Sequence, residues 1–132
     1  MKKSWLQRKS KKTPSQRLTK MLDELCATIV KNRAEWRCQK CGRDREQVTM
    51  NWAHIVRRAN REVRWRLDNA FCLCVGCHYW FDSSASRGDA EDFIRFKLGD
   101  EGWEKLKKDA RKSRQWTVKD LEKKYEELKI LL

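Results

Sequence analysis

Four of the six cysteines form two Cys-x-x-Cys pairs, a spacing that is typical of a metal site. The pairs are Cys38/Cys41 and Cys74/Cys77. Four thiolates fill the tetrahedral shell of zinc and leave no open position, so the pattern predicts a structural Zn²⁺. Such a site contributes on the order of 10 kcal/mol to folding, which a small and strongly charged core needs. Two disulfides are the alternative, and we expect no export signal because no apolar segment follows the basic N-terminus.

The other two cysteines, Cys26 and Cys72, are expected to be small buried hydrophobic residues. Cys72 could replace Cys74 as a zinc ligand, but only Cys74 has the two-residue gap to Cys77. The segment that separates the two pairs is longer than in a typical zinc finger, so it must contain an inserted structural element.

The chain has two histidines, and both lie close to the zinc cysteines in the sequence. His54 ends a segment inside the insertion, and His78 directly follows the last cysteine of the second pair. Asn69 lies between them. A single histidine is more often a structural residue than a catalyst, but the placement of these two indicates a chemical role.

Positive charge is in large excess, and it is clustered. The 32 Lys and Arg residues against 19 Asp and Glu residues give a formal net charge of +13. Such a charge attracts polyanions, nucleic acid first among them. One basic cluster lies between His54 and Asn69, and its arginines are predicted to bind DNA phosphates: Arg57, Arg58, Arg61, Arg64 and Arg66. The alternative for this stretch is a solvated surface loop.

Residues 1–12 contain basic residues and no acidic residue, so they are predicted to form a flexible arm. The arm either touches phosphates or only adds solubility. No apolar run in the sequence approaches the length of a membrane span, so we expect a soluble protein without a membrane partner. Because zinc-binding thiols require a reducing compartment, the expected location is the cytoplasm.

A helix is predicted ahead of the first cysteine pair. Thr13, Pro14 and Gln16 have the order of a capping box with proline at the first helical position. Apolar residues then recur at helical spacing until about Arg33. We expect this helix to be a scaffold with no chemistry of its own.

Two extended segments are predicted between the cysteine pairs. Alternation of apolar and polar residues from Val48 indicates a strand that ends near His54. A second alternation over residues 63–67 suggests an antiparallel strand or an extended loop, and Asp68-Asn69 marks a turn after it.

The C-terminal half is predicted to be helical. A short helix through His78 is followed by a loop over residues 83–88. Asp89 can cap the next helix, which Gly99 stops, and a further helix follows. Residues 117–120 resemble a second capping box, and the final helix that they open is expected to pack on the core.

The segments around the histidines resemble the signature of the HNH endonucleases. The resemblance lies in the segment around His54 and in the run Asn-Ala-Phe-Cys-Leu-Cys-Val-Gly-Cys-His from Asn69 to His78. The spacing from His54 to Asn69 and that from Asn69 to His78 both match the family. The resemblance implies the ββα-metal motif, in which two antiparallel strands and a helix hold one divalent ion, often braced by cysteine pairs. All parts of this motif occur in order between Cys38 and Asp82.

The resemblance also implies roles for individual residues. His54 would be the general base that takes a proton from the attacking water, for which an imidazole pKa of about 6.5 is suited. Asn69 would hold the strand pair and orient His54. His78 would bind a catalytic Mg²⁺, Mn²⁺ or Ni²⁺, with Asp82 one helical turn further as second ligand. The products would be a 5′-phosphate and a 3′-hydroxyl.

One position departs from the family pattern. Many members have an Asp or His metal ligand immediately before the catalytic histidine, where this chain has Ala53. Asp82, a substrate phosphate oxygen or water must then complete the metal shell. Impaired activity is the alternative consequence.

A narrower resemblance extends into the C-terminal part. The helix with Trp103 and Leu106, the Gln-Trp-Thr sequence at Trp116 and the final helix with Tyr125 are similar to the phage NinG (Rap) recombination nucleases. That family also has a small residue before the catalytic histidine and processes branched DNA. The resemblance implies a phage or bacterial setting, with phage DNA-processing proteins as partners.

The sequence therefore predicts an α+β, mainly helical fold. We expect one domain over residues 13–132, with a zinc-braced ββα-metal core at 36–86 and a C-terminal helical part at 89–132. The function expected is metal-dependent cleavage of duplex or branched DNA. The alternative is a zinc-stabilised DNA-binding module without catalysis.

Overall fold

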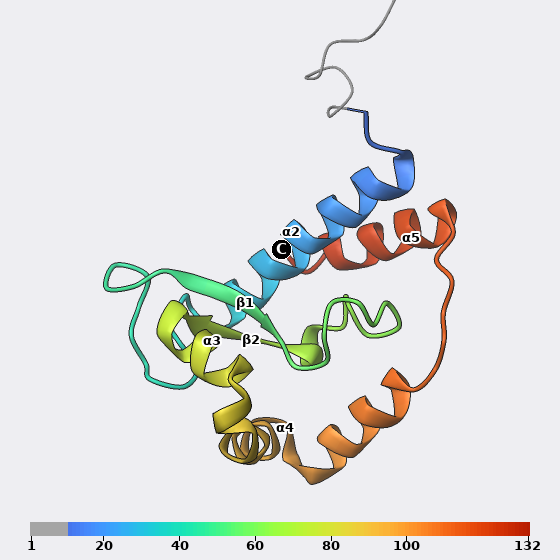
Figure 1. Ribbon diagram of the computed structural model, residues 1–132. Coiled ribbons are helices and arrows are strands. Elements are labelled where there is room, and N and C mark those ends of the chain that lie inside the picture. The colour runs from blue at the N-terminus through green and yellow to red at the C-terminus, as the bar shows by residue number, and fades with distance from the viewer. Residues whose placement is uncertain (1–10) are drawn as a thin grey trace, which may run out of the picture.

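The structure is a computed structural model, and it describes residues 11–132. Most of the arm predicted over residues 1–12 lies outside this part of the chain. The described residues form an N-terminal helix, a two-stranded antiparallel sheet and several C-terminal helices, so the fold is α+β and mainly helical (Figure 1). Among these residues, none of the helices combines the length and the apolar character that a membrane span requires.

The first helix, α2 (Pro14–Arg33), begins with the predicted capping box. The Thr13 side chain accepts a hydrogen bond from the backbone of Gln16, and the Gln16 side chain accepts one from the backbone of Thr13. The last helix, α5 (Val118–Lys129), lies beside α2 (Figure 1). Leu121 of α5 is completely buried in a cluster with apolar residues of α2. The prediction that the final helix packs on the core is therefore confirmed.

The sheet consists of β1 (Met50–His54) and β2 (Ala70–Cys74), which pair in antiparallel register. His54 lies opposite Ala70, and Cys74 lies opposite Met50. Every residue of β2 is buried, because α2 and α3 pack against the strands and apolar residues of α4 belong to the same core cluster. The two ends of this short sheet therefore carry different groups: the second cysteine pair begins at one end and His54 stands at the other.

The helix α3 (Val75–Asp82) starts directly after β2. Cys74 caps it, since its sulfur accepts a hydrogen bond from the backbone N–H of Cys77 at 3.4 Å. The helix packs against both strands, so the chain reverses its direction at Cys74 and returns along the sheet (Figure 1). Phe81 on α3 is buried in the core under the sheet.

The helix α4 (Arg87–Ala110) follows the single turn η2 (Ser84–Ser86). Gly99 interrupts α4 with a φ of 77° and a ψ of 160°, which is not helical. The positive φ is accessible to glycine without steric cost, and the chain bends there. The prediction of two helices separated at Gly99 is confirmed.

Two local predictions were wrong. For residues 63–67 the strand alternative is wrong, because residues 63–65 form turns, Leu67 begins the single turn η1 (Leu67–Asn69), and the partner of β1 is the segment Ala70–Cys74. The alternation arises because Val63 and Trp65 are buried, while Arg64 binds Asp23 of α2 and Arg66 binds Asp109 of α4. Residues 83–88 are not one loop, since α4 already begins at Arg87, and Asp89 lies in its first turn and does not cap it.

Candidate functional site

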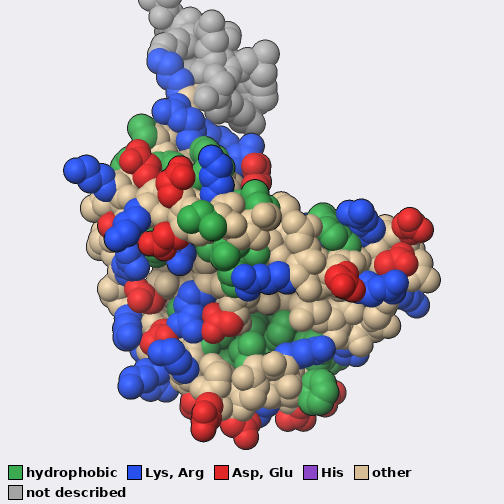
Figure 2. All heavy atoms as spheres, turned by 180° about the vertical axis from the view of Figure 1, so that it is seen from behind, with side chains coloured by type: hydrophobic (Ala, Val, Ile, Leu, Met, Phe, Trp, Pro, Cys, Tyr) green, Lys and Arg blue, Asp and Glu red, His purple; other side chains and the backbone are tan. Residues whose placement is uncertain are grey.

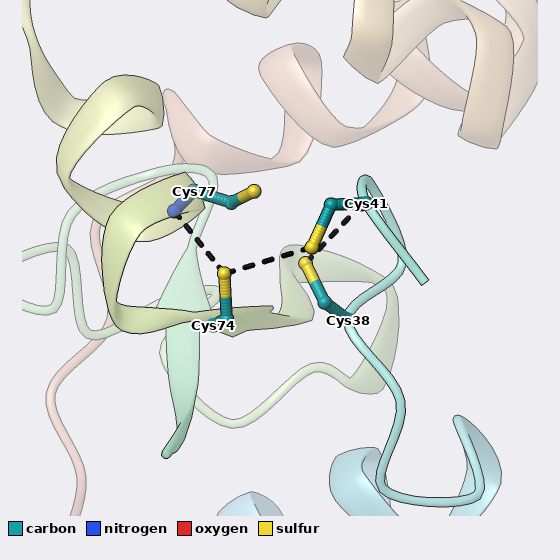
Figure 3. Close-up of side chains that lie close together, drawn as sticks. All are labelled: Cys38, Cys41, Cys74 and Cys77. Carbon is teal, nitrogen blue, oxygen red and sulfur yellow. Dashed lines mark hydrogen bonds between the residues drawn. The ribbon is translucent and has the colours of Figure 1, made fainter. Parts of the chain in front are cut away.

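The four predicted zinc ligands come together in one cluster. Cys38 and Cys41 lie in the loop before β1, whereas Cys74 and Cys77 lie at the junction of β2 and α3 (Figure 3). Gly42 follows Cys41 with a φ of 80°, which lets the loop turn back beside the sulfurs. The cluster joins the loop to the sheet and to the first turn of α3.

The geometry of the cluster fits a tetrahedral zinc ion. The four sulfur atoms all lie within 4.8 Å of one another, and the Sγ atoms of Cys41 and Cys74 are 3.8 Å apart. Zinc–sulfur bonds of about 2.3 Å in a tetrahedron give sulfur–sulfur distances of about 3.8 Å. None of the six cysteines forms a disulfide, so the alternative of two disulfides is not what this structure shows. These residues could hold a structural metal such as zinc.

Backbone amides favour the thiolate form of Cys38. The N–H of Cys41 points to the sulfur of Cys38 at 3.5 Å. Burial alone would raise the pKa of Cys38, but backbone hydrogen bonds, above all that from Cys41, lower it to about 6. A site for a divalent cation needs ionised sulfurs, and the loop supplies the donors that stabilise them.

The remaining two cysteines behave as predicted. Cys26 and Cys72 are buried, and burial raises the pKa of the Cys26 thiol to about 12 and that of Cys72 to about 11. Neither belongs to the metal cluster, so Cys74 and not Cys72 is the partner of Cys77. Both are protonated, inert thiols at neutral pH.

The two histidines line one cavity of about 420 Å³. His54 reaches it from the end of β1, and His78 reaches it from α3. The remaining lining consists of an aromatic, two basic and one acidic side chain: Trp52, Arg57, Arg58 and Asp82. No histidine is visible from behind, where basic and acidic side chains are intermixed (Figure 2).

His54 is held by a backbone carbonyl. Its Nε2 lies 3.0 Å from the carbonyl oxygen of Arg64. A carbonyl can only accept a hydrogen bond, so Nε2 carries the proton and Nδ1 keeps its lone pair. The ring also packs against Trp52, with centroids 4.0 Å apart. Burial lowers the pKa of His54 below its ordinary value, and the positive charge of Arg58 acts in the same direction. At neutral pH this imidazole is therefore an uncharged base.

Asn69 fixes the chain that follows His54. Its side chain is completely buried, and its Oδ1 accepts a hydrogen bond from the N–H of Val56 at 2.7 Å. Its Nδ2 donates to the carbonyls of Val56 and Val63, both at 3.0 Å. Asn69 thus ties the turn after β1 to the segment that carries the Arg64 carbonyl. The structure shows no hydrogen bond between the side chains of Asn69 and His54, so Asn69 orients His54 only through this segment.

His78 and Asp82 lie one helical turn apart on the same face of α3, as predicted. The Nε2 of His78 is 3.1 Å from a carboxylate oxygen of Asp82. Two adjacent ligands of an octahedral ion at about 2.1 Å are roughly 3 Å apart, so this pair fits two positions of one divalent cation. The described residues offer no third His, Cys, Asp or Glu within the same short distance, because the cysteine cluster is the only such group that they form.

Asn51 contacts His78 in addition to Asp82, and the sequence pattern did not predict this residue. The Nδ1 of His78 lies 3.1 Å from Nδ2 of Asn51 on β1. The amide N–H donates to Nδ1 in this arrangement, which places the ring proton on Nε2; with the amide turned by 180° its oxygen would instead accept from a protonated Nδ1. A metal on Nε2 requires a hydrogen bond donated by Nδ1, which such an amide can accept. The sequence around Asn51 does not indicate this role, because Asn51 meets His78 only once β1 has paired with β2 and α3 has packed back against the strands.

Ala53 cannot supply a metal ligand. It is completely buried, and its methyl group belongs to the core between the sheet and α4. Its neighbours Trp52 and His54 line the cavity, as alternation along a strand requires.

The five arginines predicted to bind DNA fall into two groups. Arg57 and Arg58 line the histidine cavity and are exposed. Arg58 also reaches Asp23 of α2 at 2.9 Å while its side chain stays 59% exposed. Among the described residues Arg57 makes no ion pair, so its guanidinium remains open to a phosphate.

The other arginines are engaged inside the protein. Arg64 binds Asp23 at 2.6 Å with both side chains largely buried, and Arg66 binds Asp68 and Asp109. The hydrogen bond from Arg66 lowers the pKa of Asp109 to about 2. Arg61 donates to Thr19 at 3.3 Å and lies over the ring of Trp65. These three side chains hold the arginine-rich segment against α2 and α4, and the prediction that they bind DNA remains untested.

Comparisons of the chain with models of protein families, with curated proteins and with solved structures each gave no match.

We expect Cys74→Ala to abolish zinc binding and to unfold the protein. A structural zinc site contributes on the order of 10 kcal/mol, which is as large as the whole stability of a typical domain. Zinc content and the thermal transition by circular dichroism measure this. Cys72→Ala is the matched control, because it removes a buried sulfur outside the cluster and should retain one zinc ion per chain. A folded, metal-free Cys74→Ala protein would contradict the structural role.

We expect His54 to titrate below pH 6.5 in the zinc-loaded protein without other divalent ions. Between the folded pKa and 6.5 the unfolded chain binds more protons than the folded one, so the stability falls as the pH drops through this window. Nitrogen-detected NMR measures the pKa and the tautomer. Arg58→Gln should raise the His54 pKa, whereas the exposed Lys119→Gln should not. A His54 midpoint above 6.5, or a proton on Nδ1, would refute this arrangement.

Proposed function

We propose that this chain is a metal-dependent DNA endonuclease of the HNH type. The observation that carries the proposal is the cavity that His54 shares with His78, Asp82 and Arg57. A neutral imidazole, a pair of metal-binding groups and an open guanidinium in one cavity are the parts that phosphodiester hydrolysis requires.

His54 serves as the general base in this proposal. Its Nδ1 takes a proton from the attacking water, and the resulting imidazolium donates from Nε2 to the Arg64 carbonyl. Arg64 is itself fixed by Asp23, so the carbonyl that orients the base is held in place from α2. Arg64, which the sequence predicted to bind DNA, thus supports the general base through its backbone carbonyl.

His78 and Asp82 are the residues that would hold the divalent cation, with water and a phosphate oxygen as further ligands. Bound there, the ion supplies charge neutralisation for the phosphate and for the leaving 3′-oxygen. Asn51 keeps the His78 ring in the orientation that presents Nε2 to the cavity. Two protein ligands suffice for magnesium, which usually keeps several waters.

Arg57 and Arg58 position the substrate. Both lie at the cavity, and a guanidinium binds a phosphate through two parallel hydrogen bonds. The net charge of +13 adds non-specific attraction to DNA. The products are a 5′-phosphate and a 3′-hydroxyl, and branched DNA of the kind processed in phage recombination is the substrate suggested by the C-terminal resemblance.

A DNA-binding module without catalysis is the second candidate. The observation that favours it is Ala53, which is buried where many family members have a metal ligand. The same basic surface would then bind DNA, and the zinc cluster would remain structural.

The test is plasmid cleavage by the zinc-loaded protein with Mg²⁺, Mn²⁺ or Ni²⁺. Loss of a general base lowers rates by about 10²- to 10⁴-fold, so His54→Ala should reduce nicking by that factor while it still binds DNA. The exposed Lys119→Ala serves as control and should cut like the unmodified protein. If the unmodified chain shifts the mobility of DNA but cuts none with any of these metals, the binding module is correct.

A further inference from the structure

A second cavity of about 440 Å³ adjoins the histidine cavity. The two share His54, Arg57 and Asp82 in their linings. The second cavity extends from the end of β1 toward the start of α4, and the last residues of α3 and the turn η2 border it. A ligand group in it would therefore lie next to whatever is bound between the histidines.

The lining of this second cavity combines buried apolar residues with more exposed charged side chains of both signs, since Asp82 and Glu91 line it as well as two arginines. Phe81, Ala90 and Ile94 line it and are buried, and Trp103 adds an indole ring. The exposed Arg57 and Arg87 also line it.

Trp103 is fixed in its place. Its Nε1 donates to the carboxylate of Glu91 at 3.3 Å, and Glu91 also accepts from Arg95 at 3.3 Å. Lys107 lies over the same ring, 4.9 Å from its centroid. The indole is therefore preorganised, which reduces the conformational entropy that this side chain loses when a ligand stacks on it.

The lining matches a nucleobase better than a phosphate or a metal ion. The buried Phe81, Ala90 and Ile94 offer no donor to an anion and no ligand to a cation, so the charged groups of the lining are left for the polar parts of a ligand. A nucleobase has apolar faces that stack on aromatic rings, and the phosphates that it carries can remain beside the exposed arginines. A base that is stacked and paired in duplex DNA cannot enter, so it must leave the helix first.

We propose that this cavity accepts the base of a nucleotide that adjoins the phosphate bound between the histidines, and that the protein thereby prefers DNA with an unpaired base. This inference rests on the proposed function for the position of that phosphate. An unpaired base leaves the stack at the lowest cost, so selectivity follows from the cavity without any reading of sequence.

The experiment compares two duplexes that differ at one unpaired position. One carries 2-aminopurine as a bulged base and the other an abasic site. Binding to the zinc-loaded protein without other divalent ions is followed by anisotropy of a distant label. Because stacking on an aromatic ring is lost with the base, the abasic duplex should bind roughly 5- to 100-fold more weakly. The fluorescence of 2-aminopurine should fall as it stacks on Trp103. Equal affinities and unchanged fluorescence would overturn the proposal.

A filling variant provides the control. Ser84→Trp places a large side chain at the border of the cavity, and Ser84 is exposed, so the fold should tolerate the change. It should remove the preference for the bulged base. Ser113→Trp, at an exposed position outside the cavity, should keep it.

Cleavage assays separate this inference from the function. A protein that prefers the bulged base but cuts no DNA with any metal supports the base cavity and refutes the nuclease. A protein that cuts DNA but binds both duplexes equally refutes the base cavity alone.

Discussion

The reversal of the chain at Cys74 is the constraint on which the rest of the site depends. Cys74 ends β2, caps α3 and contributes a sulfur to the four-cysteine cluster. Because α3 then packs back along both strands, His78 meets Asn51 and Asp82 reaches the cavity that contains His54. A metal on the four sulfurs would fix this reversal, since it joins the loop before β1 to the start of α3.

A second set of interactions holds the opposite end of the sheet. The Asn69 side chain hydrogen-bonds to the backbone of Val56 and Val63. Asp23, which lies on α2, accepts hydrogen bonds from the side chains of Arg64 and Trp65. Burial opposes the ionisation of Asp23, but hydrogen bonds from these two residues lower its pKa below the ordinary value. The Arg64 carbonyl that accepts from His54 therefore belongs to a hydrogen-bonded network that reaches α2.

The sequence predicted the parts of this site that depend on local spacing. The capping box of α2, the cysteine pairs and the pair His78 and Asp82 follow from residues a few positions apart, and the structure confirms where they lie. It did not predict features that depend on distant partners. Arg64 was predicted to contact phosphate, but its acidic partner Asp23 lies 41 residues away, and Arg66 pairs with Asp109, 43 residues away, in addition to the nearby Asp68. Asn51 and the second cavity beside His54 depend on packing that no local pattern encodes.

The central claim is that both histidines face one divalent cation. Paramagnetic Mn²⁺ tests this most directly, because it broadens NMR signals of nearby protons. When Mn²⁺ is added to the zinc-loaded protein, we predict that the ring signals of His54 and His78 broaden together, and that Asp82→Ala greatly weakens the effect. If the His54 signals keep their width while Mn²⁺ binds, the metal does not lie beside the proposed general base, and the nuclease mechanism is contradicted.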